Sequence, residues 1–302
     1  METQTERLVQ QATANRLLPF VFENGVAHGA IVRITEGVSE LLGHRDMSAS
    51  MQALIREALV AMPLFATHLN FQGRINLQFQ GEGRAKLLVA QIDEQLNVRA
   101  MAKAPADLEG SFAELLYGGV LALMVEPNDE RRAATQAVVL IEGDSLAEAL
   151  EGYFARSEQL PTMIRLTRDG DRLSAFMLQR MPLESSKKAT EADWEHVLTL
   201  ASTLGEQELS ATEPLTILRR LFANDELRVF EPRPVTVTCR CSHAGISRML
   251  LSLGRSEVES IIAEQGQVQI TCEFCGREYR FDPPEVGQLF DAAEASPDGT
   301  TH

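Results

Sequence analysis

Aromatic residues and cysteines are scarce in this chain of 302 residues, which contains one tryptophan, three tyrosines and four cysteines. Basic residues are also in the minority, because 28 Lys and Arg stand against 43 Asp and Glu and give a formal net charge of −15. A surface of this sign repels phosphate backbones, which argues against nucleic acid as a partner. No run approaches the ~20 apolar residues that span a bilayer, and the N-terminal segment has no apolar core flanked by basic residues. We therefore expect a cytoplasmic protein with no membrane partner.

The chain nevertheless has enough apolar residues, 44% of the total, to build one large domain followed by a smaller one. In residues 1–182, Asn24-Gly25 and Asp169-Gly170 each separate two runs of β-forming residues, as in hairpins. Between these hairpins lies an apolar stripe at helical spacing. The stripe consists of Met51, Leu54, Ile55, Ala58, Leu59 and Met62. This order predicts an α+β fold, with an N-terminal antiparallel-sheet domain and helices packed on it.

The composition changes after Pro182, where residues 183–191 are mostly polar and charged. We interpret residues 183–232 as a helical linker, because they carry two modest apolar stripes at helical spacing. The stripes are Trp194, Val197, Leu198, Ala201 and Leu204, and then Leu215, Leu218, Leu221 and Phe222. Helical stability comes mostly from tertiary packing, so two possibilities remain open. The helices either dock on the first domain or form a marginally stable segment that detaches.

All four cysteines lie close together near the C-terminus, in the segments Cys239-Arg240-Cys241 and Cys272-Glu273-Phe274-Cys275. Two close pairs separated by a folded insert are typical of a tetrahedral zinc site with four thiolate ligands. We therefore predict that Cys239, Cys241, Cys272 and Cys275 bind Zn²⁺. Nearby arginines would offset the negative charge that four thiolates leave around this ion. They are Arg240, Arg248, Arg277 and Arg280.

Residues 233–291 form the expected small zinc-binding domain. Apolar stripes on both sides of Gly254 predict two helices, and the alternation of Val268 and Ile270 predicts a strand that leads into the second cysteine pair. Asp282-Pro283 is typical of a helix N-terminus. Because so small a module buries little apolar surface, the metal should supply much of its folding free energy. Residues 292–302 are small and polar, and we expect them to form a frayed tail.

Three functions are compatible with the cysteine pattern. The first is a static zinc module that binds protein partners. The second is a redox switch, because each close pair can form its own disulfide, Cys239–Cys241 or Cys272–Cys275, and so remove the thiolates that hold zinc. The third is a thiol–disulfide oxidoreductase that uses Cys272 and Cys275, although the motif lacks a thioredoxin-like βαβ setting. No nucleophile–base signature of a hydrolase is present, so we do not expect an enzyme.

The segments around these cysteines resemble one known family. Cys239-Arg240-Cys241-Ser242, Leu251-Ser252-Leu253-Gly254 and residues 271–275, followed by residues 279–282, are similar to the C-terminal domain of the 33-kDa heat-shock protein family. These proteins are redox-regulated holdase chaperones of bacteria. The resemblance extends upstream to Tyr153-Phe154 and residues 157–162, and thus covers most of the chain. Ala100 and Ala137 stand where the family commonly has glycine.

This resemblance implies a mechanism. The reduced, zinc-bound form would be inactive. Oxidants would form the Cys239–Cys241 and Cys272–Cys275 disulfides, the zinc would be released, and the linker at 183–232 would unfold. The activated protein, which tends to form a homodimer in this family, would hold unfolded client proteins during oxidative stress without using ATP. The resemblance therefore favours the redox switch over the other two functions.

Overall fold

The structure, a computed structural model, describes residues 15–67, 72–81, 84–116, 118–129, 131–182 and 189–295. The chain divides into two compact units, one within Met1–Leu42 and Asp46–Thr238 and the other within Gly43–Arg45 and Cys239–His302. We call them unit 1 and unit 2. Across the described ranges, no helix combines the length and the apolar composition needed to cross a membrane.

Unit 1 contains two six-stranded sheets. Sheet A has the order β10-β1-β2-β9-β8, with β11 also paired to β1, and all of its pairs are antiparallel. Its strands are β1 (Arg16–Phe22), β2 (Ala27–Ile34), β8 (Thr162–Asp169), β9 (Arg172–Arg180), β10 (Leu227–Val229) and β11 (Arg233–Pro234). The two predicted hairpins are β1–β2 and β8–β9. Gly25 and Gly170 in their turns have φ values of 75° and 60°, which glycine adopts without strain.

Sheet B has the order β12-β5-β4-β3-β6-β7. Its strands are β3 (Gly73–Gln80), β4 (Leu87–Asp93), β5 (Asn97–Lys103), β6 (Val120–Pro127), β7 (Thr135–Leu140) and β12 (Thr236–Val237). Neighbours are antiparallel except for β12, which runs parallel to β5. Ile75, Leu77 and Phe79 on β3 are fully buried and alternate with more exposed residues, so one face of sheet B contributes to the core.

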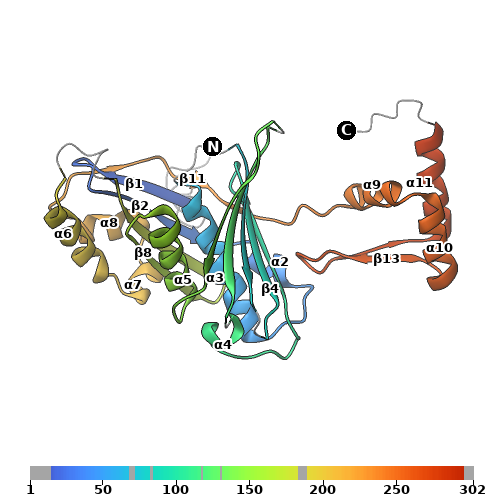
Figure 1. Ribbon diagram of the computed structural model, residues 1–302, viewed down its shortest axis with the longest axis horizontal. Helices are drawn as coiled ribbons and strands as arrows, with labels where there is room; N and C mark the ends of the chain where they lie inside the picture. The colour runs from blue at the N-terminus through green and yellow to red at the C-terminus, as the bar shows by residue number, and fades with distance from the viewer. Residues whose placement is uncertain are drawn as a thin grey trace, which may run out of the picture. The chain divides into compact units, whose positions relative to one another are not determined.

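Helix α3 (Ala49–Phe65) packs between the two sheets, as Figure 1 shows, and contacts strands of both. Its N-cap Ser48 accepts a hydrogen bond from the N–H of Met51, and every residue of the predicted apolar stripe is buried. The remaining short elements in this part of unit 1 are α2 (Val38–Leu42), α4 (Phe112–Leu116), α5 (Leu146–Tyr153) and the π-helical turn η1 (Phe154–Glu158). The α+β fold class is therefore confirmed.

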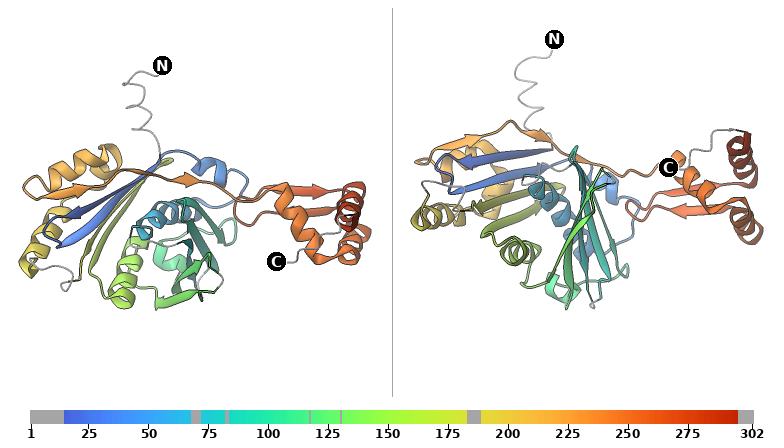
Figure 2. Two further views of the ribbon diagram at one scale, coloured as in Figure 1. Left: turned by 90° about the horizontal axis from the view of Figure 1, so that it is seen from above. Right: turned by 45° about the horizontal axis from the view of Figure 1, so that its top comes forward.

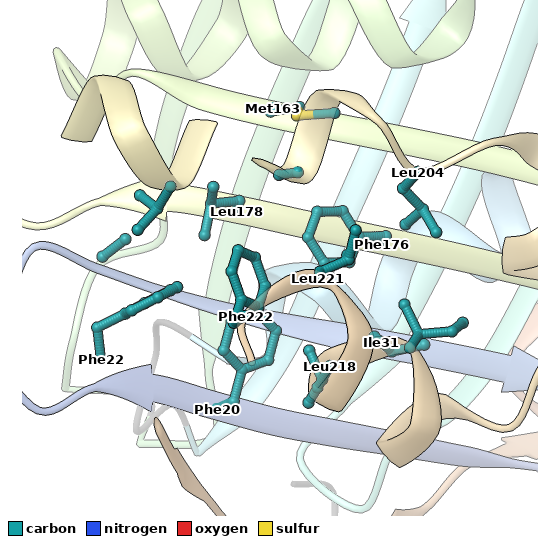
Figure 3. Packing of buried hydrophobic residues seen from close by; sticks show 14 of the residues in the cluster. Phe20, Phe22, Ile31, Met163, Phe176, Leu178, Leu204, Leu218, Leu221 and Phe222 are labelled. Atoms are coloured by element: carbon teal, nitrogen blue, oxygen red, sulfur yellow. The ribbon is translucent and has the colours of Figure 1, made fainter. Parts of the chain in front are cut away.

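The linker helices cover one face of sheet A (Figure 2). They are α6 (Glu191–Ser202), α7 (Glu206–Ala211) and α8 (Pro214–Leu221). Most residues of their apolar stripes are buried together with side chains of sheet A in one cluster (Figure 3), which we call the linker–sheet cluster. Leu198 is partly buried against this cluster, and Leu215 is half-buried outside it. It includes Leu18, Phe20, Phe22, Ile31, Met163, Phe176, Leu178, Trp194, Val197, Ala201, Leu204, Leu209, Ile217, Leu218, Leu221 and Phe222. Of the two possibilities left open by the sequence, the structure shows docked helices.

A buried arginine also fixes α7 on sheet A. Arg33, on β2, donates hydrogen bonds to the carbonyl oxygens of Leu209 at 2.9 Å and Thr212 at 2.7 Å. Burial lowers the pKa of Arg33 to about 10, so the guanidinium stays charged at neutral pH. A positive donor stabilises the unpaired carbonyls at a helix C-terminus. Both apolar and polar contacts therefore hold the linker helices in place.

The segment boundaries differ from the expected ones. Strands β11 and β12 belong to unit 1, so the C-terminal segment of unit 2 begins at Cys239, whereas we expected the zinc-binding domain to begin at residue 233. The linker segment also contains β10 in addition to its helices. Helix α11 (Pro283–Ala295) continues past 292, where we expected a frayed tail to begin, and residues 296–302 lie outside the described residues, as do residues 183–188 of the linker.

Unit 2 is built from helices around a short hairpin. Besides α11, its elements are α9 (His243–Leu253), α10 (Arg255–Gln265), β13 (Val268–Thr271) and β14 (Glu278–Phe281). Asp282 accepts a hydrogen bond from the N–H of Glu285 and so caps α11, as the sequence predicts. The buried core consists of Leu250, Val258, Val268, Tyr279, Phe281, Val286 and Phe290. A core of this size provides little folding free energy by itself.

Candidate metal centre

The two cysteine pairs lie next to regular elements of unit 2. Cys239 and Cys241 precede α9, whose N-cap Ser242 accepts a hydrogen bond from the N–H of Gly245. Cys272 and Cys275 lie in the turn between β13 and β14. In this turn the N–H of Gly276 donates to the carbonyl oxygen of Cys272 at 2.8 Å. The helix N-terminus and the turn therefore hold one pair each.

All four Sγ atoms come together. They lie within 4.8 Å of one another, and all four cysteines are free thiols. The Sγ atoms of Cys239 and Cys272 are 3.6 Å apart, and those of Cys241 and Cys275 are 3.4 Å apart. Four sulfurs at about 2.3 Å from a central ion lie roughly 3.8 Å from one another, so these residues fit a tetrahedral site. The four cysteines can therefore bind a metal ion.

Backbone N–H groups point at the sulfur atoms. Cys272 accepts hydrogen bonds from the N–H groups of Cys275 and Phe274. Burial raises the pKa of Cys272, but its hydrogen bonds outweigh burial and leave this pKa below its usual value. Burial raises the pKa of Cys239 to about 12 and also raises that of Cys275. A cation that replaces the thiol protons would relieve this cost, so its binding is expected to release protons.

Two arginines of unit 2 interact with these thiols. Arg277, which we predicted, interacts with the charges of Cys241 and Cys275, whereas Arg280 pairs with Glu278 at 2.8 Å. Arg45, in the segment Gly43–Arg45, is half-buried. Burial lowers the pKa of Arg45, and the charges of the nearby cysteines oppose this effect. The sequence does not predict a role for Arg45, because this residue lies far from the cysteines along the chain and belongs to no motif with them.

The fold and the site together define a class, an α+β protein whose separate small unit groups four thiols that can bind a metal ion. The family model described as "Hsp33 protein" matches residues 15–282. The 33 kDa chaperonin of Nitrosococcus oceani is 37% identical over 279 residues, covering 92% of this chain and 95% of that protein. The 33 kDa chaperonin of Pseudomonas paraeruginosa is 37% identical over 290 residues, covering 94% and 97%. The chain belongs to the Hsp33 family.

A solved structure supports the fold. The crystal structure of the 33 kDa chaperonin (heat shock protein 33 homolog) from Thermotoga maritima matches with a TM-score of 0.79 at 22% identity. The match covers 94% of this chain and all of that chain. The family confirms the predicted resemblance and a chaperone function, which implies binding to unfolded proteins. Because its members are named chaperonins, the family also supports the expectation that the chain is not an enzyme.

Proposed function

We propose that the chain is a redox-regulated, ATP-independent holdase that binds unfolding client proteins in the cytoplasm during oxidative stress. The observation that carries this proposal is the grouping of four free thiols within 4.8 Å in a unit with a small apolar core. Zn²⁺ is the ion that four thiolates favour, and when bound it supplies a tetrahedral crosslink between the two cysteine pairs. The reduced form would be inactive.

Oxidation would remove the metal ligands. In each close pair, Cys239–Cys241 and Cys272–Cys275, two thiolates would lose two electrons and join as a disulfide. One hydrogen peroxide and two protons would accept these electrons and form two water molecules. A disulfide sulfur is a poor ligand, so Zn²⁺ would be released and unit 2 would lose the main source of its folding free energy.

The loss of structure in unit 2 would in turn destabilise the docked linker. The segment at 183–232 is followed directly by β11, β12 and Cys239, so the chain that leaves the linker–sheet cluster enters the metal site within a few residues. If the linker unfolded, the apolar faces of sheet A and of α6–α8 would become available to clients. An apolar surface of this kind would also favour a homodimer of the oxidised form. Nucleic acid and membranes are not among the proposed partners.

The test is suppression of the aggregation of a heat-unfolded client by reduced and by peroxide-treated protein. We expect suppression only after oxidation. The matched control is the Cys239→Ser/Cys241→Ser variant, which lacks one redox pair and should give the same result before and after peroxide. Equal activity of the wild type in both states would contradict the switch and favour a static zinc module. Turnover of a small disulfide substrate would instead favour a thiol–disulfide oxidoreductase that uses Cys272 and Cys275.

A further inference from the structure

Strand β7 has an open edge. It is the last strand of sheet B and pairs with β6 on one side. The N–H of Ile141 donates to the carbonyl oxygen of Gly119 at 2.9 Å. In an antiparallel pair, every second residue directs its backbone N–H and C=O groups to the neighbouring strand, so Val139 and Ala137 also direct theirs to β6. The N–H and C=O groups of Gln136, Val138 and Leu140 therefore face the open edge. Arg156 donates to the Leu140 carbonyl at 2.9 Å and so occupies one end of the edge. At Gln136 and Val138, which are both exposed, no partner strand lies beside β7 within the part of the chain that the structure describes.

The outer face of this edge is apolar. Val138 and Leu140 are 54% and 63% exposed, the highest values among large apolar side chains in the described residues. They lie two positions apart, so both point to the same side of the strand. Edge strands usually carry charged residues that prevent pairing with other chains, and β7 (TQAVVL) has none. Such a strand is suited to pairing with another polypeptide.

A cavity of about 430 Å³ lies beside the inner face of the same strand. Ala137 of β7 and Leu123 of β6 line one side, and Phe65 and Phe154 line the other. The rings of Phe65 and Phe154 are stacked with centroids 5.3 Å apart, so this apolar wall is already formed. Tyr153 and Glu158 also line the cavity, and the Tyr153 hydroxyl donates to Glu158 at 3.1 Å.

We propose that β7 and this cavity form a docking site for an extended apolar segment of an unfolded polypeptide. The segment would add a strand next to β7 through the backbone groups of Gln136 and Val138. Side chains of an added strand alternate between the faces of a sheet. One set would therefore cover Val138 and Leu140, and the other would enter the cavity against Phe65 and Phe154. Glu158 at the cavity would favour a segment with basic rather than acidic residues.

The geometry favours an unfolded chain over a second copy of this protein. A folded partner has its backbone groups already paired, whereas an unfolded chain offers free N–H and C=O groups. A stable dimer buries roughly 800 Å² on each partner, but an edge of six residues is only about 20 Å long. The site thus suits weak capture of one segment. It lies outside the linker–sheet cluster, so it is open before oxidation as well as after it.

The test is fluorescence anisotropy with a labelled peptide of about nine residues that alternates Val and Thr and ends in Lys. Val138→Lys places a charge at the centre of the edge, and Ala137→Phe fills the cavity. Leu253→Lys, at an apolar residue of unit 2 with 52% exposure, is the matched control. We expect the first two changes to weaken binding about tenfold in both redox states, and the control to leave it unchanged.

The inference rests on the proposed function only for the nature of the partner. Binding that depends on Val138 in both redox states would support the site even if peroxide failed to activate the holdase. Unchanged peptide binding by Val138→Lys and Ala137→Phe would overturn the site, whatever the result for the holdase. Loss of self-association in the Val138→Lys variant, with normal peptide binding, would assign the edge to a second copy and also overturn the proposal.

Discussion

At the scale of single residues, the backbone conformation of Gly276 affects the stability of unit 2, and the burial of His28 affects the stability of unit 1. Gly276 follows the second cysteine pair with a φ of 74°, and a Cβ at this position would lie 2.5 Å from the carbonyl oxygen of His44 in the same unit. Left-handed backbone at this position favours glycine. The turn that carries Cys272 and Cys275 therefore depends on this residue.

We predict that Gly276→Ala destabilises unit 2 by at least about 1 kcal/mol and accelerates metal loss to a chelating dye several-fold. Gly287→Ala is the control, because Gly287 lies within α11 and its Cβ would meet no atom within 4 Å. Alanine there should stabilise the helix by about 0.5–1 kcal/mol and not accelerate metal loss. Equal rates of metal loss in the two variants would contradict the role of Gly276.

His28 on β2 provides a pH-dependent contribution to the stability of unit 1. Burial lowers the pKa of His28, and its hydrogen bond with Gln179 opposes this shift. As the pH falls below about 6.5, the unfolded chain takes up a proton before the folded protein does. Because the unfolded state then binds more protons, stability falls with pH, with a slope of at most about 1.4 kcal/mol per pH unit from this group.

We predict that His28→Gln has a smaller loss of stability than the wild type between pH 7 and pH 5. The measurement is urea unfolding of the two proteins at several pH values. Below the pKa of His28 in the folded state, both states are protonated, and this group no longer makes the stability depend on pH. A variant with the same pH slope as the wild type would show that His28 does not make this contribution.

At the scale of elements, the linker helices are held by a cluster rich in aromatic residues. Phe222, at the end of α8, is 2% exposed, and its ring lies edge-on to Phe22 with centroids 5.0 Å apart. It also lies 6.2 Å from Phe20. Phe230, in the same segment, is 47% exposed. Substitution of the exposed Phe230 is therefore a matched control for substitution of the buried Phe222, because only Phe222 contributes to linker docking.

We predict that Phe222→Ala weakens linker docking by about 3–5 kcal/mol, the usual range for a large buried ring. Limited proteolysis between α6 and α8 should become faster under reducing conditions, and client aggregation should be suppressed without peroxide. Phe230→Ala should leave both unchanged. If Phe222→Ala remained as protease-resistant and as inactive as the wild type, the linker–sheet cluster would not hold the linker.

The sequence predicts some of these elements and misses others for physical reasons. The sequence predicts α3 from its apolar stripe and the two hairpins from Asn24-Gly25 and Asp169-Gly170, because both signals are local. The sequence leaves the docking of α8 open, because Phe20 and Phe22 belong to a strand near the other end of the chain. Strands β11 and β12 have two residues each and no alternation. The four cysteines were grouped correctly from their spacing alone, whereas Arg45 has no motif that links it to them.

At the scale of the whole molecule, one continuous stretch of chain joins the linker to the four cysteines. After α8, the strands β10 and β11 pair with β1, and β12 pairs with β5. Cys239 follows β12 after a single residue, Thr238. On the proposed function, loss of structure at the cysteines would remove an anchor at the end of these short strands. Because each strand has only two or three residues, its pairing is weak, and we expect it to be sensitive to that loss.

The most direct test follows metal content and hydrogen exchange together during peroxide treatment of the full chain. We expect exchange in α6–α8 to become fast as the metal is released, while α3 in the core of unit 1 stays protected. Reduction and added zinc should restore protection of the linker helices. Release of the metal with α6–α8 still protected would contradict the claim that the four cysteines control linker docking.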